Sequence, residues 1–155
     1  MQVRNVCKCE PSIMFLDDEP ANLTIMDWFP SMCAVKVKVE KFYSPLLAIK
    51  AYEKSLSKKC CGKGFPLIVT DIMMPVMDGF EFSKTVLEME KARRLESKMQ
   101  HGLTVLALTS CVNKGVKKDA KKVGIRKVFL KPMTFQTYED FILKNYYVPV
   151  LKNNR

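Results

Sequence analysis

The chain has 155 residues, the length of a single globular domain, and its 48% hydrophobic content excludes intrinsic disorder. No uncharged run approaches the roughly 20 apolar residues of a membrane span, and residues 1–10 lack the apolar segment of a signal peptide, so we expect a soluble chain in the reducing cytoplasm. The net charge is +10, but residues 112–155 alone carry +8, which excludes a basic surface around the whole domain.

Five short apolar runs predict β-strands: Ile13–Leu16, Val35–Val39, Leu67–Thr70, Thr104–Leu108 and Lys127–Leu130. Four of them are almost continuously apolar, which is typical of strands buried on both faces of a parallel sheet. In Val35–Val39 the valines alternate with lysines, and this pattern predicts a strand at the edge of the sheet.

Helices are predicted between the strands, at Asn22–Phe29, Pro45–Leu56, Phe80–Ser97, Lys114–Val123 and Phe135–Asn145. Pro30 should end the first helix, Gly124 should end the fourth, and Ser44 with Pro45 should begin the second. Strands that alternate with helices predict an α/β domain with a doubly wound, five-stranded parallel sheet and five helices. We expect this domain at residues 12–147, with an extension at 1–11 and a tail at 148–155.

The six cysteines lack the density of a disulfide framework, so free thiols are expected. Cys7, Cys9, Cys60 and Cys61 could together hold zinc, but neither pair has the CxxC spacing of zinc sites, and reduced thiols are favoured. His101 is the only histidine, and we interpret it as an exposed loop residue rather than a phosphodonor.

Polar side chains follow four of the predicted strands, where an open parallel sheet binds its ligands. They are Asp17, Asp18 and Glu19 after the first strand, Asp71 after the third, Thr109 and Ser110 after the fourth, and Lys131 and Pro132 after the fifth. Aspartates that converge at one edge would repel one another unless a hard cation lay among them, so the sequence predicts a Mg²⁺ site.

A carboxylate, a hydroxyl and an ammonium near Mg²⁺ can serve phosphoryl transfer as nucleophile, hydrogen-bond donor and charge clamp. Each piece alone is commonly a helix cap or a turn. The hypothesis depends on their coincidence at successive strand ends.

From Ile13 to Tyr146 the sequence resembles receiver domains of two-component response regulators and hybrid histidine kinases. The resemblance is carried by four motifs: Leu16-Asp17-Asp18-Glu19-Pro20, Asp71-Ile72-Met73-Met74-Pro75-Val76-Met77-Asp78-Gly79, Leu108-Thr109 and Leu130-Lys131-Pro132. The chain is expected to be either a single-domain regulator or the cytoplasmic part of a larger sensor kinase. The longest motif is similar in style to that of hybrid kinases, which favours the second.

This resemblance implies a flavodoxin-like fold and a phosphoacceptor role for Asp71. It implies that Asp18, Asp71 and the Met73 carbonyl bind Mg²⁺, with Asp17 assisting through water. It further implies that Thr109 binds a phosphoryl oxygen, that Lys131 pairs with the phosphorylated aspartate, and that a cis peptide bond precedes Pro132.

Other residues in these motifs have simpler interpretations. We interpret Asp78 and Gly79 as a helix cap and turn, and the side chains of Met73, Met74 and Met77 as packing or loop residues. Receivers commonly carry an aromatic residue three positions before the lysine, where Val128 stands here, and Phe129 should point to the opposite face. We therefore expect any aromatic switching to be absent or rerouted.

A predicted helix carries five lysines on one side, at positions spaced 0, 3, 4, 7 and 8: Lys114, Lys117, Lys118, Lys121 and Lys122. A solvated face is the first interpretation, an acidic protein partner the second and nucleic acid the third, because no aromatic residues lie between the lysines.

The sequence thus predicts a signalling switch rather than an enzyme, phosphorylated by a histidine kinase or a histidine phosphotransfer protein. The alternatives are a degenerate receiver that only binds proteins and a basic nucleic-acid-binding domain.

Overall fold

The computed structural model describes residues 12–34, 37–57, 64–96 and 102–143. Its strands are β1 Ser12–Leu16, β2 Lys38–Phe42, β3 Leu67–Asp71, β4 Thr104–Thr109 and β5 Lys127–Leu130. They form one parallel sheet of five strands in the order β2-β1-β3-β4-β5. The predicted doubly wound α/β fold is confirmed.

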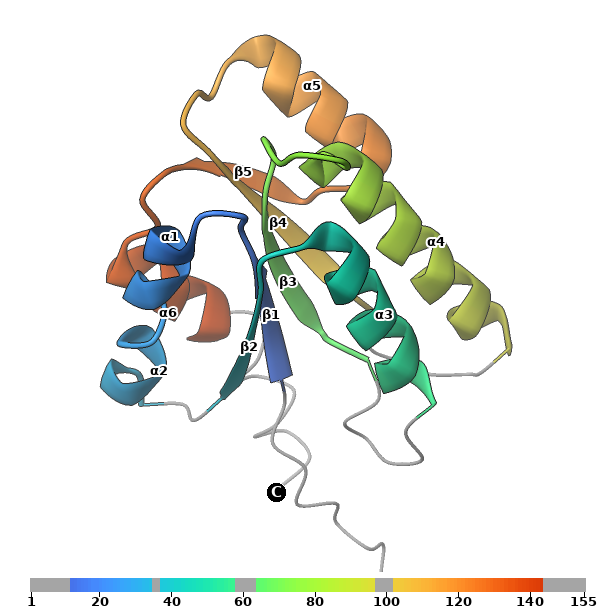
Figure 1. The fold of residues 1–155 in the computed structure, drawn as a ribbon, viewed down its shortest axis with the longest axis horizontal. Helices are drawn as coiled ribbons and strands as arrows, with labels where there is room; N and C mark the ends of the chain where they lie inside the picture. Colours follow the sequence, from blue (N-terminus) through green and yellow to red (C-terminus); the bar gives the residue numbers. More distant parts are fainter. Residues whose placement is uncertain (1–11, 35–36, 58–63, 97–101, 144–155) are drawn as a thin grey trace, which may run out of the picture.

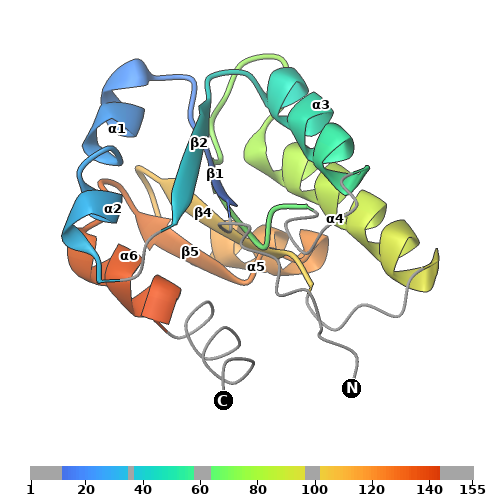
Figure 2. The same cartoon turned by 90° about the horizontal axis from the view of Figure 1, so that it is seen from below.

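Helices cover both faces of the sheet (Figures 1 and 2). One face carries α1 Pro20–Ile25, α2 Phe29–Met32 and α6 Phe135–Ile142, and the other carries α3 Pro45–Leu56, α4 Gly79–Glu96 and α5 Lys114–Val123. Successive strand residues supply the two cores in turn: Ile13 and Phe15 pack with α1, α2 and α6, whereas Met14 and Leu16 pack with α3, α4 and α5.

Local signals fix the ends of the helices that the sequence predicted best. The side chain of Ser44 accepts a hydrogen bond from the Leu47 amide at the start of α3. Asn113 does the same for the Val116 amide at the start of α5, and Gly124, with φ of 95°, ends that helix in a left-handed turn. These caps explain why both helices have the predicted bounds.

The first predicted helix, Asn22–Phe29, is wrong in its extent. Helix α1 ends at Ile25, the chain then passes through three tight i→i+3 turns, and α2 begins as a separate single turn at Phe29. Pro30 has no amide hydrogen to donate, so a continuous helix cannot pass through it, whereas the first turn of α2 tolerates it.

The second strand is at the edge of the sheet, as predicted, but it extends to Phe42, beyond the predicted end at Val39. The structure describes it over Lys38–Phe42, and the first two residues of the predicted strand, 35 and 36, lie outside the described residues. Its five residues pair with all of β1, and the charged Glu40 and Lys41 are tolerated because this strand is only half buried. The prediction that β5 is buried on both faces is also wrong, because β5 forms the other edge and Leu130 is exposed.

Some predictions fall outside the described residues: the thiols of Cys7, Cys9, Cys60 and Cys61, the position of His101, and the helix ends at Ser97 and Asn145. Within the described ranges, Cys33 and Cys111 are free thiols, as predicted. None of the described helices is both long and apolar enough to cross a membrane.

A buried polar network ties α3 to α4. The hydroxyl of Tyr52 donates to Glu90 Oε2 at 2.7 Å, and Arg93 Nε donates to the same oxygen at 2.9 Å. Burial and the Glu90 hydrogen bond raise the pKa of Tyr52, so its hydroxyl stays protonated and able to donate. The charge of Glu90 is therefore compensated inside the molecule.

Tyr138, on α6, is equally buried but differently placed. Its ring packs against Phe15, Phe29 and Phe135, and among the described residues its hydroxyl has no hydrogen-bond partner. Burying a hydroxyl without a partner opposes folding.

The same substitution at these two tyrosines should have opposite effects. Tyr52→Phe should lower the free energy of unfolding by about 1–3 kcal/mol, because buried Glu90 loses a donor. Tyr138→Phe should leave it unchanged or raise it by up to about 1 kcal/mol, because an unpaired polar group is removed. Urea denaturation of both variants measures this, and equal losses in the two would contradict the assignment.

Candidate functional site

The predicted site lies at the edge of the sheet where the strands end. Asp17 and Lys131 directly follow β1 and β5, and their backbone amides extend the sheet by donating to Phe42 and Thr109 at 3.1 and 2.8 Å. Asp71 ends β3 and is paired with Leu108 of β4, so Thr109 stands one residue further along the neighbouring strand. Four strands thus hold the four side chains at one edge.

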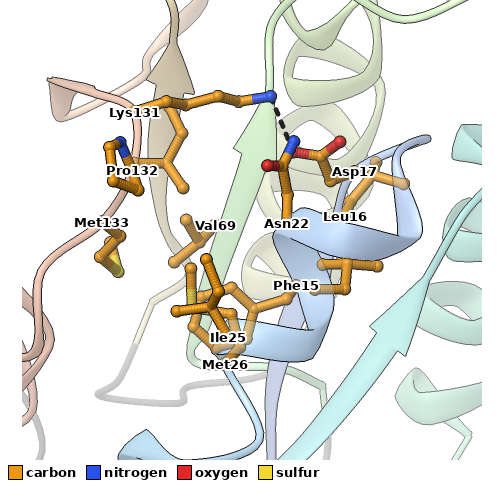
Figure 3. Close-up of a pocket in the computed structure, with 12 residues that line it drawn as sticks. Phe15, Leu16, Asp17, Asn22, Ile25, Met26, Val69, Lys131, Pro132 and Met133 are labelled. Atoms are coloured by element: carbon orange, nitrogen blue, oxygen red, sulfur yellow. Dashed lines mark hydrogen bonds and ion pairs between the residues drawn. The ribbon is translucent and has the colours of Figure 1, made fainter.

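Lys131 joins the two buried carboxylates. Asp17 is 3% exposed and Asp71 4% exposed, and the Lys131 Nζ lies 2.8 Å from Asp17 Oδ2 and 3.1 Å from Asp71 Oδ1. Figure 3 shows the lysine side chain reaching from the end of β5 toward Asp17. The structure records a cis peptide bond between Lys131 and Pro132, as the resemblance implied.

Burial and charge oppose each other at Asp71. Burial raises the pKa of its carboxyl above the usual value, and Lys131 and the Met73 amide only partly offset this rise. Burial alone would lower the pKa of Lys131, but its contacts with Asp17 and Asp71 raise it overall, so the ammonium stays charged. The lysine is the internal counterion that keeps two buried carboxylates close together.

The carboxylates fit a hard cation. Asp17, Asp18 and Asp71 each offer an oxygen, and these oxygens lie within 4.8 Å of one another. At a bond length of about 2.1 Å, oxygens on an octahedral Mg²⁺ are about 3.0 Å apart when adjacent and about 4.2 Å apart when opposite, so the three carboxylates would have to move inward or bind in part through water. All three donors are carboxylate oxygens, the ligand type that Mg²⁺ prefers.

Thr109 and Met73 lie around this cluster. Thr109 is buried, and its Oγ1 accepts a hydrogen bond from the Cys111 amide at 3.3 Å. Met73 donates its own amide to Asp71 Oδ1 at 3.3 Å, while its side chain is 73% exposed. The Met73 side chain therefore stands in solvent beside the phosphoacceptor candidate.

The loop after Asp71 is held by Gly79. The Gly79 amide donates to the Ile72 carbonyl at 2.8 Å, and a Cβ at this glycine would lie 2.1 Å from the Asp71 carbonyl oxygen. Only glycine permits this approach. Asp78 accepts from the Glu81 amide at 2.9 Å, which confirms it as the cap of α4.

Sequence reasoning missed two partners of Asp17. The Glu19 amide donates to Asp17 Oδ1 at 2.9 Å, and the Asn22 side-chain amide donates to Asp17 Oδ2 at 3.0 Å. Asn22 was interpreted only as the start of a helix. Asn22 lies five residues after Asp17, with a loop and the start of α1 between them. Neither the helical nor the strand period relates two positions across such a loop, so the sequence did not indicate their contact.

An apolar pocket lies beside the site, between α1 and the loop that joins β5 to α6 (Figure 3). Ile25, Met26 and Met133 line its apolar part, and Asn22 and Lys131 also contribute to its wall. The pocket thus connects the helix that carries Asn22 with the loop that carries Lys131.

Val128 and Phe129, three and two positions before Lys131, point to opposite faces of the sheet, as predicted. Val128 packs with the core of α3, α4 and α5, whereas Phe129 packs with the other core and makes an edge contact with Phe141 of α6. An aliphatic residue therefore occupies the position where receivers commonly carry an aromatic ring.

Helix α5 exposes all five predicted lysines and buries Ala120 against the core. The one ion pair recorded within this helix joins Lys122 to Asp119 at 3.2 Å. Arg126 and Lys127, which follow α5 in the sequence, are also exposed.

Comparison with known proteins gives a consistent result. Residues 13–143 match the response regulator receiver domain family. The chain is 26% identical over 135 residues to sensor protein GacS of Pseudomonas syringae pv. syringae, which covers 86% of this chain and 13% of GacS. It is 24% identical over 148 residues to two-component response regulator 24 of Arabidopsis thaliana, which covers 95% of this chain and 93% of that protein.

Solved structures share the fold. A chain in the co-crystal structure of the Saccharomyces cerevisiae histidine phosphotransfer protein Ypd1 with the receiver domain of Ssk1 matches with a TM-score of 0.74 at 19% identity, covering 90% of this chain and 91% of that one. Vibrio cholerae chemotaxis protein CheY4 matches with a TM-score of 0.68 at 22% identity, covering 88% and 99%.

The chain therefore belongs to the response regulator receiver domain family of two-component signalling, as its motifs suggested. It spans only 13% of the length of the sensor kinases that it matches, so their activities as whole proteins are not transferred to it.

Proposed function

We propose that this domain takes a phosphoryl group from a phosphohistidine onto Asp71, in the presence of Mg²⁺, and signals by a change of conformation. One observation carries the proposal: Asp71 is a buried carboxylate held beside two other aspartates and in contact with a lysine ammonium. A domain that served only as a binding module would not need such costly clustering of charge.

In the proposed step a carboxylate oxygen of Asp71 attacks the phosphorus atom. An O–P bond forms, the P–N bond of the phosphohistidine breaks, and the imidazole leaves with the electron pair and takes a proton from solvent. The contacts of Lys131 and the Met73 amide both fall on Oδ1 of Asp71, which favours Oδ2 as the attacking oxygen. The reaction needs no general base, because the carboxylate attacks in its ionised form.

Mg²⁺ would be held by Asp18 and Asp71, with the Met73 carbonyl as a further ligand and Asp17 acting through water. When bound, it neutralises charge on the transferred phosphoryl group. The close carboxylate oxygens support this assignment.

Thr109 and Lys131 are proposed to bind the oxygens of the new phosphoryl group. The Thr109 hydroxyl would donate to one phosphoryl oxygen, and Lys131 would pair with another as its contact with unmodified Asp71 is replaced. Both follow strands at the same edge as Asp71, and Lys131 already touches the phosphoacceptor. Population of a second conformation would then follow from these new contacts.

The proposed donor is a histidine kinase or a histidine phosphotransfer protein. The fold shared with a receiver that was crystallised with such a protein supports this choice, as do the sensor kinases among the relatives. Because these donors act on receivers inside the cell, we place the domain in the cytoplasm. We propose that it acts as a switch rather than an enzyme, because it accepts the phosphoryl group on its own side chain.

A second surface is proposed for an acidic protein partner: Lys114, Lys117, Lys118, Lys121 and Lys122 on α5. Their exposure and the single acidic residue on this helix support strong electrostatic attraction. The lack of aromatic side chains between the lysines favours protein over nucleic acid.

Asp71→Asn should abolish phosphorylation while the fold is retained. Intact-mass measurement after incubation with Mg²⁺ and acetyl phosphate should show one added phosphoryl group on the native chain and none on the variant. A chelator should prevent labelling of the native chain. Equal labelling of the variant, or labelling that ignores the chelator, would refute the assignment.

In the presence of Mg²⁺, which would replace part of the lost positive charge, Lys131→Ala should keep the fold at reduced stability but lose the response to phosphorylation, because the ammonium would link the phosphoryl charge to β5 and its loop. Amide chemical shifts with and without beryllofluoride, a phosphoryl mimic, measure this response. Shifts in the variant that equal those of the native chain would contradict the role.

Changing Lys117, Lys118 and Lys121 to Glu should weaken binding to the cognate acidic partner most strongly at low salt, because surface charges act through long-range attraction. Labelling of Asp71 by acetyl phosphate should be unaffected, since no protein docking is required.

The matched control changes three exposed lysines of α3 and α4, Lys50, Lys54 and Lys84, to Glu and should have a smaller effect. Duplex DNA should bind weakly at physiological salt. Tight DNA binding with a steep salt dependence that only the α5 variant removes would establish the nucleic-acid alternative.

A further inference from the structure

Asp17 makes more recorded contacts than the other two carboxylates of the cluster. Its Oδ1 accepts from the Glu19 amide at 2.9 Å, and its Oδ2 accepts from Asn22 Nδ2 at 3.0 Å and from Lys131 Nζ at 2.8 Å. Asp17 is only 3% exposed, so these donors replace most of the water that the carboxylate would otherwise bind. Its orientation is therefore set by three protein donors from three parts of the fold.

Asn22 is the one donor among these that is neither backbone nor charged. It lies in the first turns of α1, is half buried, and also donates to Glu19 Oε2 at 3.2 Å. The same amide nitrogen thus spans two acidic side chains, and it shares Oδ2 of Asp17 with the lysine. Because a side-chain amide donates without adding a charge, it can orient Asp17 and leave the attraction of the cluster for a cation intact.

We infer that Asn22 is a positioning residue that fixes the Asp17 carboxylate, and through it the Lys131 ammonium, in the arrangement that receives Mg²⁺. This inference rests on the proposed function. Without Asn22, Asp17 would keep its contact with Lys131, and its carboxylate could turn toward the lysine and away from the Glu19 amide. The cluster would then have to be reordered whenever the cation binds, which lowers its affinity.

The test compares Asn22→Leu, which keeps similar bulk, with Asn22→Ala, which does not; both remove the donor. Thr24→Ala is the matched control, because Thr24 lies on the same helix, is exposed, and gives up one hydrogen bond, from its hydroxyl to the Pro20 carbonyl. Titration calorimetry of the whole chain with MgCl₂ should show a Kd raised roughly tenfold in both Asn22 variants and unchanged in the control.

Two further measurements separate positioning from a general effect on α1. The Glu19 amide proton should shift upfield in both Asn22 variants without metal, because its acceptor, Asp17 Oδ1, has moved. Labelling of Asp71 by acetyl phosphate should be slow in these variants at limiting Mg²⁺ and recover at saturating Mg²⁺. A merely structural role for Asn22 would lower labelling at limiting and at saturating Mg²⁺ alike, so the recovery decides between the two roles. The upfield shift is supporting evidence only, because Asn22 contacts Glu19 directly.

The outcomes distinguish this inference from the proposed function. If the native chain binds Mg²⁺ and both Asn22 variants bind it within twofold, the inference is overturned and the phosphoacceptor proposal stands. A loss in only one variant would trace the effect to side-chain shape and would also overturn it. If the native chain binds no Mg²⁺, the proposed function fails, and this inference fails with it.

Discussion

The contact of one lysine with two buried aspartates is the interaction on which the site depends. Asp17 and Asp71 come from neighbouring strands, and without a cation between them their mutual repulsion and loss of water would oppose folding. Lys131 reaches both because its strand ends at the same sheet edge, two strands away from β3. The parallel sheet therefore brings the charges together, and the lysine makes their proximity tolerable.

Most of this arrangement could be predicted from the sequence, because simple periodic rules govern it. Continuous apolar runs identified β1, β3 and β4, and the polar residues after them had to meet at one edge of a parallel sheet. Helix α5 has the predicted bounds: Gly124 is a strong local end signal, and the structure shows that Asn113 caps the start of the helix. Where the sequence carries such local end signals, as in α3 and α5, the helix in the structure has the predicted bounds.

The features that could not be predicted depend on contacts between distant segments. Glu90 lies on a charged helix and reads as a surface residue, yet Tyr52, 38 positions earlier, covers it. The role of Asn22 depends on the path of the loop into α1. The sequence predicted the end of β2 at Val39, because the charged residues Glu40 and Lys41 do not look like strand residues until they are seen to pair with β1. Pro30 marks a break, but the sequence does not say that α1 has already ended at Ile25.

The two buried charge networks differ in a way that separates stability from function. Glu90 pairs with Arg93 and accepts a hydrogen bond from Tyr52, so its negative charge is compensated by groups of the chain itself. Where the strands end, three carboxylates lie together and the one lysine contacts two of them, so the cluster has an excess of negative charge. In the proposed function a divalent cation would supply the missing positive charge, and phosphoryl transfer would change the balance again by adding negative charge at Asp71. Lys131 contacts both Asp17 and Asp71, so it can respond by moving closer to one of them. An incompletely neutralised cluster of this kind is therefore suited to act as a switch. The Glu90 network, whose charge is compensated, is suited to hold α3 and α4 together.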